Sequence, residues 1–163
     1  MTLIRAAMIA VLAGAILVPD PKSWILFSIA CVAFALDGFD GWFARKSGLT
    51  SAFGARFDME IDALLGAVLA SILLAGGHVG LEILVLGFTR YVFVAAGFFE
   101  PKLLAVLPES LRRKSVCVVQ IAALIVLLCP LTPVWLMHPI SWCAALLLLW
   151  SFGRDTLWLL ARR

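Results

Sequence analysis

Six long apolar runs, separated by short breaks, dominate this sequence of 163 residues. A helix that crosses a membrane needs about 20 mainly apolar residues, because the hydrocarbon core of a bilayer is about 30 Å thick. Hydrophobic residues make up 64% of the chain and charged residues 14%, whereas soluble domains average about 45–50% and about 25%. The pattern predicts an all-α integral membrane protein, with six transmembrane helices over residues 2–18, 24–43, 52–74, 79–99, 115–131 and 135–160.

Basic residues are distributed unequally between the two ends of these predicted helices. Lys22 falls at one end, Arg90 lies within a run, and the opposite end collects Arg5, Arg45, Lys46, Arg56, Lys102, Arg112, Arg113, Lys114, Arg154, Arg162 and Arg163. An excess of Lys and Arg marks the cytoplasmic face of a membrane protein. We therefore expect a multi-pass protein of the inner (cytoplasmic) cell membrane with both termini cytoplasmic, organised as one domain over residues 1–163. Attraction to anionic lipid accounts for the net charge of +3, and nothing suggests nucleic acid as a partner.

Four aspartates occur where burial of charge is most costly, in the second and third apolar runs. Asp37 and Asp40 are three residues apart and Asp58 and Asp62 are four apart, so each pair shares one face of a helix. The short connection over residues 45–51 makes the two helices antiparallel neighbours. The spacing therefore predicts an acidic site at the cytoplasmic end of helices two and three.

Carboxylates that converge within a membrane repel one another. Because a charged side chain in a membrane is costly, its presence there favours a functional role. One or two divalent cations would remove the repulsion, and an all-oxygen ligand set favours Mg²⁺ or Mn²⁺. Two such ions about 3.5–4 Å apart can hold the attacking and leaving oxygens of a phosphoryl displacement. Gly41, Ala44 and Gly54 leave space for a ligand beside the acids, although small residues also serve tight helix packing.

These residues form one continuous pattern, Asp37-x2-Asp40-Gly41-x2-Ala44-Arg45-x8-Gly54-x3-Asp58-x3-Asp62. The pattern resembles the signature of the CDP-alcohol phosphotransferase (CDP-alcohol phosphatidyltransferase) family at every fixed position and spacing. The resemblance implies a phospholipid biosynthesis enzyme that transfers the phosphatidyl group of CDP-diacylglycerol to a small alcohol and releases CMP. It implies two divalent ions held by Asp37, Asp40, Asp58 and Asp62, with Asp62 also the catalytic general base. It implies contacts to the CDP moiety from Asp37, Gly41, Ala44, Arg45 and Gly54.

The acceptor alcohol is less clearly indicated than the donor. Glycerol 3-phosphate is slightly favoured, yet the run over residues 57–63 departs from the Asp-Pro-x2-Asp-Lys run of phosphatidylglycerophosphate synthases. Inositol phosphate and serine stay open as acceptors. A six-span cation transporter that uses the buried aspartates is the alternative of another class, although its polar groups are expected nearer mid-membrane.

Several basic residues outside the pattern are candidates for binding a phosphorylated acceptor, namely Arg90, Arg112, Arg113 and Lys114. For Arg90 the alternative is a structural pair with a carboxylate of the acidic site, and for the other three it is attraction to lipid headgroups. Arg5 either faces the site from the first helix or extends to the membrane interface.

Two further features concern helix contacts. Arg56 and Glu60 are four residues apart and favour an ordinary pair along one helix. Gly66, Ala67 and Ala70 permit a close helix contact, which could lie between the subunits of a homodimer.

Overall fold

The computed structural model describes residues 2–17, 23–47, 52–99 and 111–161, and these are helical except at short turns. No strand occurs among them, so the all-α part of the prediction is confirmed. A short 3-10 helix, η1 (Ala15–Leu17), follows the first α-helix. The α-helices are α1 (Thr2–Gly14), α2 (Trp24–Ser47), α3 (Ala52–Ala75), α4 (Glu82–Phe99), α5 (Leu111–Leu128) and α6 (Val134–Ala161).

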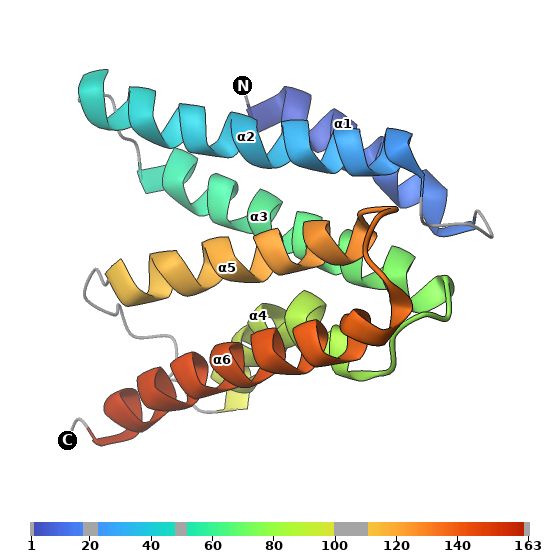
Figure 1. Ribbon diagram of the computed structural model, residues 1–163. Coiled ribbons are helices and arrows are strands. Elements are labelled where there is room, and N and C mark those ends of the chain that lie inside the picture. Colours follow the sequence, from blue (N-terminus) through green and yellow to red (C-terminus); the bar gives the residue numbers. More distant parts are fainter. Residues whose placement is uncertain (1, 18–22, 48–51, 100–110, 162–163) are drawn as a thin grey trace.

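Successive helices run in alternating directions (Figure 1). Helix α3 contacts α1, α4 and α5, whereas α6 packs on α4 and α5, and α2 lies against α1 and α5. Each helix matches one of the predicted apolar runs, with boundaries that differ by a few residues. The largest differences are at α2, which continues to Ser47, and at α5, which begins at Leu111.

Helix α3 forms the centre of this bundle. Every residue from Leu65 to Ala70 is buried, and Leu69, Ile72 and Leu73 are at most 1% exposed. A helix that is apolar on all sides is stable where neighbours surround it, which agrees with its contacts to three other helices. The first half of α3 carries Asp58 and Asp62, so the most enclosed helix also positions two of the candidate site residues.

Helices α3 and α4 approach closely at Gly87. A Cβ atom at this position would lie 2.6 Å from the Cβ of Ala70 and 3.3 Å from the Cα of Ala67. Small residues allow helix backbones to approach closely within membranes. The small residues of α3 that could have marked a subunit contact are therefore used inside the chain, against α4.

Large apolar side chains are exposed on the outer surface of the bundle. Phe98, Phe99, Trp135 and Leu157 are each at least 70% exposed, which a water-soluble surface rarely shows over a wide area. By length and composition, α4 and residues 134–159 of α6 are long and apolar enough to cross a membrane. Shorter apolar stretches occur in α1 with η1, in α2 and in α5, at 3–17, 24–38 and 115–128.

The turn between α3 and α4 is fixed by glycine and by one carboxylate. Gly77 adopts a positive φ of 68°, a conformation that favours glycine and ends a helix. Glu82, at the start of α4, accepts hydrogen bonds from the backbone N–H of Gly80 at 3.0 Å and from the Ser141 hydroxyl at 3.2 Å. Its Oε1 also lies 2.8 Å from Nδ1 of His138. This cluster, called the Glu82 cluster below, joins the start of α4 to α6.

Candidate active site

Three carboxylates from two helices converge beside α1. Asp37 lies on α2, and Asp58 and Asp62 are one turn apart on α3. One oxygen from each lies within 4.8 Å of one from each of the others. The three side chains are 26%, 36% and 39% exposed, respectively, so each retains accessible surface. Helices α2 and α3 run in opposite directions (Figure 1), and both pack on α1, which brings these residues to one level of the bundle.

Arg5 on α1 contacts all three carboxylates. Its Nη1 lies 2.9 Å from Oδ1 of Asp37 and 2.6 Å from Oδ1 of Asp58, while its Nη2 pairs with Oδ1 of Asp62. The Arg5 side chain is completely buried. Because one guanidinium faces three carboxylates, this group of residues, called the Arg5 cluster below, keeps an excess of two formal negative charges.

The donors of the Arg5 cluster fit a divalent cation of the hard type. Mg²⁺ and Mn²⁺ bind oxygen ligands, and Mg²⁺ is commonly held by one or two carboxylates together with substrate phosphates. The three aspartates offer oxygens close enough to share an ion. The single positive charge of Arg5 does not neutralise their three negative charges. The arrangement is therefore suited to bind a metal and, through it, an anionic diphosphate.

The rest of the predicted motif is described only in part. The side chains of Asp40, Gly41, Ala44 and Arg45 lie outside the described part of the chain. Gly54 is exposed and lies one turn before Asp58 on α3.

Arg90 lies on α4 and contacts α3 on a different side from the Arg5 cluster. Its Nη2 forms an ion pair with Oε1 of Glu60, and Glu60 falls between Asp58 and Asp62 in the sequence, on a different side of the helix. Both side chains are substantially exposed, at 34% and 55%. The structural alternative for Arg90 was a pair with a carboxylate of the acidic stretch, and its partner is Glu60 of that stretch. The side chain of Arg56, the partner expected for Glu60, lies outside the described residues.

Arg112 connects the start of α5 to α6. It donates to the Ser151 hydroxyl at 2.8 Å and to the Ser151 carbonyl at 3.2 Å, and it pairs with Asp155. The guanidinium also lies 5.6 Å from the ring centroid of Trp150, within the range of a cation–π contact. The side chains of Arg113 and Lys114 lie outside the described residues.

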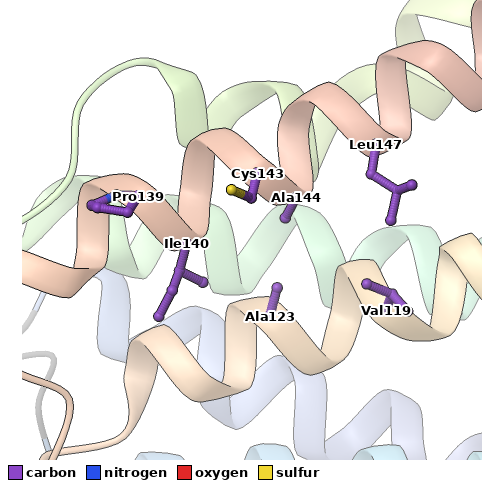
Figure 2. Close-up of a pocket in the computed structure, with 7 residues that line it drawn as sticks. All are labelled: Val119, Ala123, Pro139, Ile140, Cys143, Ala144 and Leu147. Atoms are coloured by element: carbon purple, nitrogen blue, oxygen red, sulfur yellow. The ribbon is translucent and has the colours of Figure 1, made fainter.

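A separate groove lies between α5 and α6, and Figure 2 shows the side chains that line it. Its volume is about 350 Å³. The lining residues are Val119, Ala123, Pro139, Ile140, Cys143, Ala144 and Leu147. None of these carries a charge, so the groove cannot perform phosphoryl chemistry, and the Arg5 cluster is the better candidate for the active site.

The residue that sequence reasoning left unresolved is Arg5. Its position four residues into the first apolar run fits either an interfacial or a site-facing side chain. The structure places it among the aspartates. The sequence signal was a single basic residue in an otherwise apolar helix. The direction in which the Arg5 side chain points depends on the rotation of α1 about its axis, which the sequence does not give.

Comparison with known proteins identifies the family. The CDP-alcohol phosphatidyltransferase family model matches residues 1–150, and the chain belongs to this family. No curated protein matches the sequence. Members of the family are membrane-embedded transferases of phosphorus-containing groups, which use a CDP-alcohol and an alcohol acceptor in lipid synthesis. They generally use divalent metal, in agreement with the donor set of the Arg5 cluster.

Proposed function

We propose that this protein transfers the phosphatidyl group of CDP-diacylglycerol to a small polar alcohol and releases CMP. The observation that carries the proposal is the convergence of Asp37, Asp58 and Asp62 within 4.8 Å in a chain of this family. Glycerol 3-phosphate is the favoured acceptor, with inositol phosphate and serine as the alternatives within the same family.

The aspartates Asp37, Asp40, Asp58 and Asp62 would hold two Mg²⁺ or Mn²⁺ ions. When bound, such ions neutralise the diphosphate of the donor and stabilise the charge that develops during phosphoryl displacement. Arg45 would add positive charge on the donor side, and Gly41, Ala44 and Gly54 would leave space for the CDP moiety. The exposure of Gly54 supports this use of the surface next to Asp58.

Asp62 is the proposed general base. An alcohol is a weak nucleophile until a positioned base accepts its proton. Among the three described aspartates, Asp62 is the most exposed, at 39%, which supports its access to an incoming hydroxyl. Its Oδ1 is held by Arg5, so the carboxylate has a fixed orientation toward the substrate.

Arg90, Arg112, Arg113 and Lys114 remain the proposed acceptor-binding residues. Arg90 and Arg112 already pair with Glu60 and Asp155. A phosphorylated acceptor would therefore share these guanidinium groups with the carboxylates or replace them.

We place the protein in the inner cell membrane as a homodimer, with six spans, both termini cytoplasmic and the site facing the cytoplasm. The alternating helix directions support this topology (Figure 1), as does the basic excess at the ends of the predicted spans on the N-terminal side. The exposed apolar side chains of α4 and α6 suit contact with lipid. A donor with two acyl chains would then reach the site without leaving the bilayer.

The test is CMP release from CDP-diacylglycerol by the purified protein in detergent. We expect release to require Mg²⁺ or Mn²⁺ together with one acceptor from a panel of glycerol 3-phosphate, inositol phosphate, serine and glycerol. The control is Glu82→Gln, which alters the Glu82 cluster and leaves every proposed site residue in place. Metal-dependent ion flux in vesicles without CMP release for any acceptor would instead establish the transporter.

A further inference from the structure

Arg5 contacts the three carboxylates from the buried side of the site. Each of its contacts is to the Oδ1 atom of an aspartate, and an ionised carboxylate has two oxygens with about four acceptor positions. Arg5 is completely buried, whereas the aspartates are between about a quarter and two-fifths exposed. The accessible surface of the carboxylates therefore lies away from the guanidinium, so a cation can approach while Arg5 stays in place.

Displacement of Arg5 by a metal ion would be costly. The described residues provide no other carboxylate contact for its guanidinium, and its buried Nε already has no hydrogen-bond partner among them. Removing the partners of a buried charge leaves that charge without compensation, which is strongly unfavourable. A divalent ion that took the place of Arg5 would have to overcome this cost.

Without Arg5, the three carboxylates would separate. They come from two helices and carry like charges within 4.8 Å of one another, so they favour positions further apart. A metal ion would then have to bring them together at the moment of binding. Partners that orient metal ligands typically change metal affinity by about 10- to 100-fold.

We propose that Arg5 is a positioning residue, a fixed buried cation that gathers Asp37, Asp58 and Asp62 into one ligand set and stays bound to them when the metal binds. This inference rests on the proposed function, because it requires that the aspartates bind a divalent ion. It assigns α1 a direct part in assembling a site whose ligands lie on α2 and α3.

The experiment measures Mn²⁺ binding to the purified full chain in detergent by electron paramagnetic resonance. We expect Arg5→Gln to lower Mn²⁺ affinity about 10- to 100-fold. We expect Arg5→Lys to restore part of this loss, because an ammonium keeps the charge but lacks the planar fork that reaches several carboxylates. Glu82→Gln is the matched control, since it alters a buried polar cluster elsewhere and should bind Mn²⁺ as the unaltered protein does.

Three outcomes distinguish this inference from the proposed function. Equal or tighter Mn²⁺ binding by Arg5→Gln would overturn the positioning role, and tighter binding would show that Arg5 competes with the metal. If the unaltered protein binds no Mn²⁺, or Asp58→Asn binds it equally well, the proposed metal site fails and the inference fails with it. If Arg5→Gln does not fold, Arg5→Lys decides alone, because an ammonium cannot hold three carboxylates as the planar guanidinium does. Reduced Mn²⁺ affinity then supports the proposal, and affinity equal to that of the unaltered protein overturns it.

Discussion

The Arg5 cluster and the Glu82 cluster use buried charge in opposite ways. In the first, one guanidinium serves three carboxylates that remain partly exposed. In the second, one carboxylate that is only 7% exposed contacts the backbone of Gly80, the hydroxyl of Ser141 and the ring of His138. The first site has unused capacity for cations, whereas the second is satisfied by the chain itself. Among the described residues, a ligand site is therefore indicated where several carboxylates share one cationic partner.

The largest expected difference between the two clusters is in catalysis. Asp62→Asn should lower the rate of CMP release by about 10²- to 10⁴-fold, the usual contribution of a general base. Donor binding should be largely retained, because Asp37 and Asp58 stay in place. Comparing turnover with equilibrium binding of CDP-diacylglycerol checks this. Loss of donor binding would assign Asp62 mainly to holding metal.

The close contact of α3 and α4 involves no charged side chain, so it can be compared with the two charged clusters. Gly87→Ala should destabilise the protein by about 1–3 kcal/mol, because the added methyl group meets α3 where the helices are already in contact. The measurement is the thermal unfolding midpoint in detergent. The matched control is Gly153→Ala on α6, where a Cβ would meet nothing within 4 Å. If both variants have the same midpoint, the close approach of α3 and α4 is not a constraint on stability.

A smaller effect is expected at the Glu82 cluster. Glu82→Gln keeps the size of the side chain but removes its charge, and hydrogen bonds to charged groups are stronger than neutral ones. We expect a loss of about 1 kcal/mol in stability, seen as a lower unfolding midpoint at every metal concentration. If Mn²⁺ raises the unfolding midpoint of Glu82→Gln by a different amount from that of the unaltered protein, the two clusters are coupled rather than independent.

The smallest effect is expected at Glu60, which shares α3 with Asp58 and Asp62. Among the described residues it pairs with Arg90 alone and is exposed, and exposed pairs contribute about 0–1 kcal/mol. Glu60→Gln should therefore change the unfolding midpoint little and leave Mn²⁺ affinity unaltered. A loss of Mn²⁺ binding as large as that from Asp58→Asn would show that position along α3, rather than the face of the helix, selects metal ligands.

Much of the fold follows from local sequence patterns. The apolar runs predict the helices, because their length and hydrophobicity are properties of neighbouring residues. The spacing of Asp58 and Asp62 places them on one face by helix geometry alone, and the opposite directions of α2 and α3 put Asp37 at the same end of the bundle. These inferences need no knowledge of distant parts of the chain.

Local sequence patterns do not predict which residues pair with isolated charged side chains. Arg5 is separated from Asp58 by 53 positions, and its direction depends on how α1 is rotated against α2 and α3. Arg90 is 30 positions from Glu60, and either face of α3 offered it a carboxylate. The small residues of α3 likewise predict a close helix contact, but they do not predict that the contacting residue is Gly87 of the same chain.

The burial of Arg5 has a consequence for how the chain is made. A ribosome releases the first helix before the residues that neutralise its arginine have been synthesised, and Asp62 is the last of these. An unpaired arginine is costly within hydrocarbon, so we expect the first helix to settle fully into the bilayer only after the third has emerged. Insertion of the chain into the bilayer and assembly of the Arg5 cluster would then occur together.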